Sequence, residues 1–268
     1  METTILVGID GSIASRAAIA WAIARAGALG CDVTLLTVVD DEWGTISDRD
    51  LRELRSDAEQ LAARELEYAR QIAGRVPISA AVDVGAPMLE LASFASDFEV
   101  VAIGSHKTGS FHGQALGARG LQLAAIAAVP IAIVPSSSAN GRSGVIVGAG
   151  NAPGWIHAVR FAMREAARMD ESLTVIRSDR GTPFDEQSLR VLLDAADAVD
   201  AAVDVELRRT STAAGEALAS ASRRAVLTVS GRPTEPGAHG YRPLGRTNHD
   251  LLMNAGGPVV IVPHATAG

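Results

Sequence analysis

The same pattern of apolar segments occurs twice along the sequence, in the same order. Four segments of the first half recur in the second: residues 6–8 as 146–148, 34–38 as 172–176, 80–84 as 201–205, and 129–135 as 257–263. An ordered internal repeat indicates two copies of one fold rather than one large domain. We therefore predict a first domain at residues 1–135, a linker rich in Ser, Gly and Asn at 136–143, and a second domain at 144–264.

Short apolar segments of strand length alternate with helical patterns in the first half. We expect strands at residues 5–9, 33–39, 79–84, 100–103 and 131–134, and helices at 17–28, 50–73, 88–96 and 118–128. Strands that alternate with helices form a parallel sheet covered on both faces. The predicted fold is α/β, with two repeated domains that each contain a five-stranded parallel sheet.

Composition excludes several classes of protein. The net charge of -7 argues against a nucleic-acid binder, which needs clustered Lys and Arg. The longest apolar run, residues 123–134, is shorter than the roughly 20 residues that cross a bilayer, so no membrane partner is expected. The single cysteine, Cys31, cannot form an internal disulfide and is interpreted as a structural thiol. These features are typical of a cytoplasmic protein.

A glycine-rich loop follows the strand predicted at residues 100–103 and leads into a helix. Such a loop suits phosphate, because glycines let the backbone come close and the first N–H groups of the helix have no internal partner. The alternative is that its glycines, Gly104, Gly109, Gly113 and Gly117, form a long turn. Asp10, Val38 and Gly104 all lie at carboxyl ends of strands, where one cleft would collect them.

Three motifs together resemble the universal stress protein family in its tandem form. They are VGIDGS at residues 7–12, the segment from Gly104-Ser-His to Leu116-Gly117, and VPIAIV at 129–134. The resemblance implies a Rossmann-like fold of the adenine nucleotide alpha hydrolase-like type. It also implies that the two domains pair through their last strands, residues 131–134 and 259–262. The family includes members that bind ATP and members that do not.

The ATP-binding members share a loop of Gly, two residues, Gly, nine residues, Gly, then Ser or Thr. Here the spacing holds from Gly104 to Gly117, but Lys107 replaces the second Gly and Ala118 replaces the hydroxyl residue. The Cβ of Lys107 would hinder a close phosphate approach, whereas its ammonium would attract a phosphate. Arg119 adds a second positive charge. The sequence is compatible with either effect of Lys107 on phosphate binding.

The resemblance implies a site for ATP or another adenine nucleotide in the first domain. It places Asp10 against the nucleoside and the backbone of Val38 against adenine, and the remaining candidates follow the loop: Gly104, His106, Lys107, Gly109, Gly117, Ala118 and Arg119. In the second domain Gly150 replaces Asp10, prolines at 233, 236 and 243 remove backbone donors, and Glu235 would repel phosphate. No nucleotide is expected there.

The sequence therefore predicts a non-enzymatic stress-response regulator that binds an adenine nucleotide in domain 1 only, with at most weak incidental ATP hydrolysis. One alternative is a degenerate protein-interaction scaffold, and another is an adenylyl-transferring enzyme on the same architecture. The six histidines show no metal-ligand spacing, so no metal is expected. The expected partner surfaces are the intramolecular domain pair, a homodimer and an unidentified protein.

Overall fold

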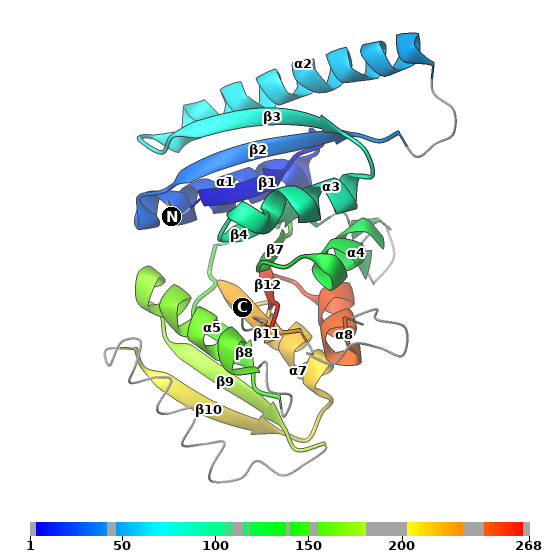
Figure 1. Ribbon diagram of the computed structural model, residues 1–268. Coiled ribbons are helices and arrows are strands. Elements are labelled where there is room, and N and C mark those ends of the chain that lie inside the picture. Colours follow the sequence, from blue (N-terminus) through cyan, green and yellow to red (C-terminus); the bar gives the residue numbers. More distant parts are fainter. Residues whose placement is uncertain are drawn as a thin grey trace. The chain divides into compact units, whose positions relative to one another are not determined.

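A computed structural model describes residues 4–41, 47–105, 107–108, 115–116, 118–137, 140–150, 155–180, 203–232 and 244–264. Only the backbone is described at 107, 108, 115, 116 and 118. The chain forms two compact units (Figure 1). Unit 1 comprises Met1–His106 and Ala118–Ser136, and unit 2 comprises Lys107–Gly117 and Ser137–Gly268.

Unit 1 is built on a parallel sheet. Its strands are β1 (Thr4–Gly8), β2 (Asp32–Val39), β3 (Ile78–Val84), β4 (Val100–Gly104) and β7 (Ile131–Val134), in the order β7-β4-β1-β2-β3. The central strand β1 is inaccessible to solvent at Ile5, Leu6 and Val7. A run that is apolar on both faces is typical of a strand with helices above and below it. The predicted five-stranded parallel sheet is confirmed.

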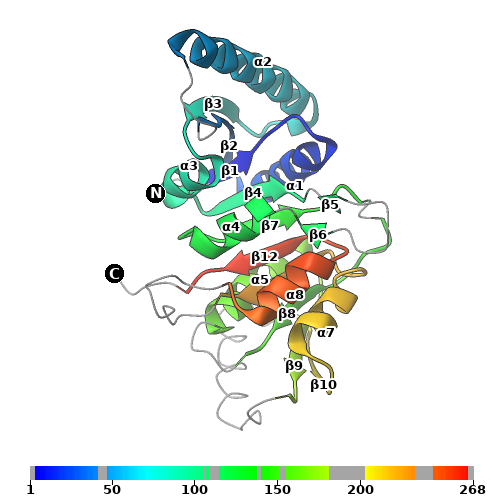
Figure 2. The same ribbon diagram turned by 90° about the vertical axis from the view of Figure 1, so that its right-hand side faces the viewer.

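Helices cover both faces of this sheet (Figure 2). They are α1 (Ile13–Leu29), α2 (Asp48–Ala73), α3 (Pro87–Phe94), followed by a 3-10 turn at Ala95–Asp97, and α4 (Ala118–Ile126). Helices α1 and α2 contact each other, as do α3 and α4. α1 buries Ala18, Ile19, Ala22 and Ala26 completely, at the three- to four-residue spacing of one helix face. It begins four residues before the predicted start, because Ser12 caps it.

Unit 2 repeats this sheet. Its strands are β8 (Val145–Gly148), β9 (Leu173–Ser178), β10 (Val205–Thr210), β11 (Leu227–Gly231) and β12 (Val259–Val262), parallel in the order β10-β9-β8-β11-β12. The helices described are α5 (Trp155–Met169), α7 (Ala214–Ala221) and α8 (Arg246–Asn254), and α7 contacts α8. A short antiparallel pair joins β5 (Lys107–Thr108) to β6 (Ala115–Leu116).

Strand register corrects two of the four sequence matches. Gly8 lies opposite Leu36 and Gly148 opposite Ile176, so Leu36 corresponds to Ile176. The match of 34–38 with 172–176 is therefore two residues out of register. The pentapeptide AAVDV is a false match: residues 80–84 lie within β3, whereas its second copy reaches β10 only at Val205. Residues 201–202 lie outside the described part of the chain.

Two residues of the predicted linker, Arg142 and Ser143, belong to unit 2 and bond to other parts of it. Arg142 Nη2 donates to the carbonyl oxygen of Gly256 at 2.6 Å, and the N–H of Ser143 donates to the carbonyl oxygen of Arg224 at 2.9 Å. Burial lowers the pKa of Arg142.

Pairing of the two units through their last strands stays a prediction. None of the described helices combines the length and the apolar character that crossing a membrane would require.

Candidate functional site

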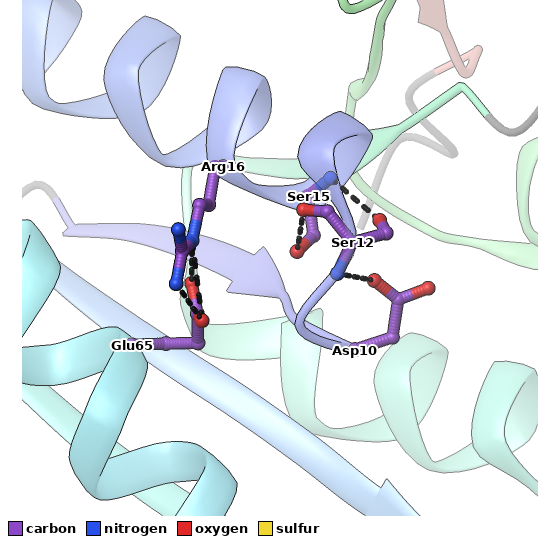
Figure 3. A network of polar contacts seen from close by, with 5 residues as sticks. All are labelled: Asp10, Ser12, Ser15, Arg16 and Glu65. Atoms are coloured by element: carbon purple, nitrogen blue, oxygen red, sulfur yellow. Dashed lines mark hydrogen bonds and ion pairs between the residues drawn. The ribbon is translucent and has the colours of Figure 1, made fainter.

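Asp10 holds the turn between β1 and α1. The backbone N–H of Ser12 donates to Asp10 Oδ1 at 3.0 Å (Figure 3). Between them, Gly11 has φ +75°, a conformation that L side chains rarely adopt, and a Cβ there would lie 2.8 Å from Leu61 Cδ1. The second carboxylate oxygen of Asp10 points away from the turn, and the residue is exposed. One side of the carboxylate thus shapes the turn while the other faces outward.

Ser12 then begins helix α1. Its Oγ accepts the N–H of Ser15 at 3.0 Å, and Ser15 Oγ donates to the Ser12 carbonyl at 3.1 Å. A serine N-cap satisfies only one of the four unpaired N–H groups of the first turn. The first turn contains no acidic residue. The positive end of the α1 dipole is therefore not neutralised from within its own first turn, which suits an anion.

Arg16 fastens this end of α1 to α2. Its Nη2 and Nε donate to Glu65 Oε1 and Oε2 at 2.9 and 3.0 Å (Figure 3). Its guanidinium also lies 4.7 Å from the ring centre of Tyr68. The Glu65 side chain is 2% exposed. Hydrogen bonding to Glu65, and then the charge of that carboxylate, raise the pKa of Arg16. The pair fixes α1 one turn beyond its cap.

Gly104 closes the carboxyl end of β4 against α1. A Cβ on Gly104 would lie 2.5 Å from the carbonyl oxygen of Ala14 and from the N–H nitrogen of Ser15, so only glycine fits without movement. Ser105 follows, 6% exposed, and its N–H donates to the carbonyl oxygen of Val134 at 2.8 Å. Its Oγ has no hydrogen-bond partner within the described residues. This buried hydroxyl lies directly after the strand end that contacts the start of α1.

An ion pair joins the end of β2 to the start of α4. Arg119 Nη2 donates to Asp40 Oδ2 at 2.8 Å, with the Arg119 side chain 63% exposed and the Asp40 side chain 19% exposed. Val38 lies two residues before Asp40 in β2, half-buried and opposite Asp83 of β3. The carboxyl edge of the unit 1 sheet therefore presents Asp10, the start of α1, Val38, Ser105 and the Asp40–Arg119 pair.

Unit 2 differs from unit 1 at two positions of the equivalent edge. The N–H groups of Ile9 and Ala149 donate to corresponding carbonyls of β2 and β9, so Gly150 is the counterpart of Asp10. The N–H groups of Ser105 and Arg232 likewise donate to the carbonyls that end β7 and β12, so Arg232 is the counterpart of Ser105. Arg232 is 5% exposed. Unit 2 thus lacks the carboxylate and has a buried cation in place of a hydroxyl.

Comparison with known proteins decides the family. Residues 1–135, half of the chain, match the model of the universal stress protein family. The chain belongs to the universal stress protein family.

Individual relatives agree with this assignment. Universal stress protein Rv2623 of Mycobacterium tuberculosis is 29% identical over 140 residues, which cover 51% of this chain and 46% of that protein. Universal stress protein Rv2624c of the same species is 29% identical over 167 residues, 61% of this chain and 60% of that protein. The chain therefore aligns with about half of the length of these two relatives.

A solved structure shares the fold across both units. The universal stress protein of Archaeoglobus fulgidus DSM 4304 superposes with a TM-score of 0.80 at 17% identity, over 99% of this chain and 97% of that one. At this identity the likeness shows the fold alone. It agrees with the α/β fold of parallel sheets covered by helices that the sequence predicts for this universal stress protein.

The structure places some of the site residues predicted for this universal stress protein and not others. Asp10, Val38, Gly104 and Arg119 lie at the carboxyl edge of the unit 1 sheet. Lys107 and Ala118 are described by backbone alone, the first in β5 and the second at the start of α4. His106, Gly109 and Gly117 lie outside the described residues. Their roles in ligand binding stay predictions.

Sequence patterns missed the residues that hold this edge together. Ser12, Ser15 and Glu65 have no place in the glycine-loop motif, although a serine before a helical pattern is a recognisable N-cap signal. The Arg16–Glu65 and Asp40–Arg119 pairs join residues 49 and 79 positions apart, which no local pattern relates. Within the described residues, no group of three or more His, Cys, Asp or Glu could hold a metal ion.

Proposed function

We propose that this universal stress protein is a non-enzymatic regulator that binds ATP or another adenine nucleotide in unit 1. Family membership supports a role in the stress response. The observation that carries the proposal is the turn at Asp10, whose carboxylate is braced on one side by the Ser12 N–H at 3.0 Å and points outward on the other. A braced carboxylate is a ready acceptor for the hydroxyl groups of a ribose.

The start of α1 supplies the complementary group for the phosphates. Its first turn carries no acidic residue, and helix N-termini attract anions. Arg16 and Glu65 hold that end of the helix in place, so it is preorganised in the free protein. In this arrangement the nucleoside lies at Asp10 and Val38, and the phosphates lie toward α1 and the glycine-rich loop.

Calorimetry on nucleotide-stripped protein tests this proposal. Titration with ATP and with AMP should each release heat with one site per chain. An absence of heat at millimolar concentrations of both ligands would reject nucleotide binding. A parallel assay of ATP turnover separates a regulator from an enzyme, because sustained hydrolysis well above background would contradict the non-enzymatic role.

A protein-interaction scaffold that binds no nucleotide is the second candidate. It is favoured by the Asp40–Arg119 ion pair at 2.8 Å, since this contact engages a cation expected to help bind phosphate. Lys107 and Ala118 depart from the loop pattern of the ATP-binding members, and these departures also favour a protein that binds no nucleotide. A negative calorimetric result combined with a folded protein would favour this scaffold.

For unit 2 we propose that no nucleotide binds in the manner of unit 1. Gly150 takes the position of Asp10, so no carboxylate is available there for ribose hydroxyls. Calorimetry should accordingly give a stoichiometry of one adenine nucleotide, not two, per chain.

A further inference from the structure

Two histidines of unit 2 that lie far apart in the sequence come together in the fold. His157 belongs to the first turn of α5, and His264 is the second residue after β12. Helix α5 contacts β12, which brings the two side chains side by side. Their ring centres lie 5.1 Å apart, with an angle of 74° between the ring planes. No local spacing relates these residues, so sequence patterns could not reveal the pair.

The separation of the two rings matches that of two imidazoles that share a metal ion. A metal such as Zn²⁺ lies about 2.0–2.1 Å from each ligating imidazole nitrogen, so two rings on one tetrahedral ion have their centres about 5 Å apart. The observed 5.1 Å already has this value. Each ring must also turn one nitrogen toward the ion, and rotation about χ2, which is broad for histidine, provides this.

His264 contains a nitrogen whose bonding capacity is unused. Its Nδ1 is buried and has no hydrogen-bond partner among the described residues. A buried polar atom without a partner is unfavourable, because it has lost its hydrogen bonds to water. An edge-to-face contact with the ring of His157, which is the alternative role of the pair, leaves this nitrogen unsatisfied. A bond to a metal ion would satisfy it.

The surroundings favour the form of the side chains that binds metals. Both histidines are half-buried, so an ion can reach them from solvent. Imidazole must be neutral to act as a ligand. Burial, and then the charges of His264 and Arg160, lower the pKa of His157 below its ordinary value of 6.5. The ring of His157 is therefore neutral at pH 7 and available as a ligand.

We propose that His157 and His264 form a binding site for a divalent transition-metal ion of the class that prefers imidazole ligands, such as Zn²⁺ or Cu²⁺. Two protein ligands leave further coordination positions for water. Mg²⁺ and Ca²⁺ prefer oxygen ligands and should not compete. The site lies within unit 2 and is independent of nucleotide binding in unit 1. It differs from the absence of a metal that histidine spacing alone predicts.

Titration of the full, untagged chain with Zn²⁺ tests this site. The calorimetry is done without nucleotide, because the phosphates of ATP would themselves bind the metal. Saturable binding should persist in a tenfold excess of Mg²⁺, and Cu²⁺ should bind more tightly than Zn²⁺. Electron paramagnetic resonance of the Cu²⁺ complex should show coupling to imidazole nitrogen. No saturable binding at millimolar Zn²⁺, or no such coupling, would overturn the proposal.

Phenylalanine substitutions separate a metal site from an aromatic pair. His157→Phe and His264→Phe each keep a ring in contact with the remaining histidine but remove the ligating nitrogens, so each should weaken Zn²⁺ binding at least tenfold. His249→Phe replaces a described histidine of α8 that lies beside Asp250, and this matched control should bind as the wild type does. Unchanged affinity in folded His157→Phe or His264→Phe would contradict the site.

Thermal unfolding gives a second readout on the same variants. A ligand that binds the folded state raises the melting temperature. Saturating Zn²⁺ should therefore raise the melting temperature of the wild type and of His249→Phe, and should leave that of His157→Phe and His264→Phe unchanged. An equal rise in all four proteins would place the bound metal elsewhere and overturn the proposal.

Discussion

Arg16 of α1 and Glu65 of α2 form a two-pronged ion pair, with Nη2–Oε1 and Nε–Oε2 distances of 2.9 and 3.0 Å. The two side chains differ in burial, since Arg16 is 45% exposed and Glu65 only 2%. A buried carboxylate is costly unless a cation and hydrogen bonds compensate it. Arg16 therefore stabilises the contact of α1 with α2 mainly by neutralising Glu65.

Replacing Arg16 alone should destabilise the fold more than replacing both Arg16 and Glu65. Arg16→Met should lower the urea concentration at the midpoint of unfolding more than Glu65→Leu does. The double variant should have a higher midpoint than Arg16→Met alone, because it no longer buries an uncompensated charge. Arg55→Met breaks the exposed pair with Glu59 and should change the free energy of unfolding by less than about 0.5 kcal/mol. Wild-type stability of Arg16→Met would contradict this interpretation.

Gly104 should be intolerant of even a methyl group. A Cβ there would lie 2.5 Å from two backbone atoms of α1, at Ala14 and Ser15, so Gly104→Ala should lower the free energy of unfolding by about 1–3 kcal/mol. Gly27→Ala is the control within α1. Its Cβ would meet only Val76 at an ordinary 3.5 Å, and it should stabilise the helix by about 0.5–1 kcal/mol. Chemical denaturation of both variants measures the contrast, and equal effects would refute the close approach.

His157 should make the protein less stable in mild acid. Burial lowers the pKa of His157 below 6.5, with smaller contributions from His264, whose ring lies 5.1 Å away, and from Arg160. The unfolded state then binds more protons than the folded state as the pH falls below about 6.5, so stability decreases. His157→Phe should lose less stability between pH 7.5 and 5.5 in thermal unfolding. A larger loss of stability in His157→Phe than in the wild type over this pH range would contradict a lowered pKa of His157.

Apolar periodicity was sufficient to predict the strands and helices of unit 1. The last strand, Ile131–Val134, matches its expected bounds, and β2 and β3 each begin one residue early. These segments are set by burial, which a local pattern encodes. Helix α1 was predicted too short, because the pattern locates the apolar residues but the cap at Ser12 sets where the helix begins.

Strand register and side-chain contacts could not be predicted from local sequence patterns. The identical pentapeptides at residues 80–84 and 201–205 suggested equivalent strands, yet pairing with β9 begins only at Val205. A five-residue match, with four positions Ala or Val, occurs readily by coincidence. Register, in contrast, depends on the neighbouring strand. The exchange of Ser105 for Arg232 became evident only through matching backbone hydrogen bonds.

Binding of ATP to the Asp10→Asn variant tests the central proposal most directly. Asparagine keeps the Oδ1 acceptor for the Ser12 N–H and removes only the charge, so the turn at the start of α1 should remain folded. Asp41→Asn, at an exposed residue two positions after β2, is the control. By calorimetry, wild type and Asp41→Asn should bind one ATP with equal affinity, and Asp10→Asn should bind about tenfold more weakly. Equal affinity of all three proteins, or no binding by the wild type, would contradict a nucleotide site at Asp10.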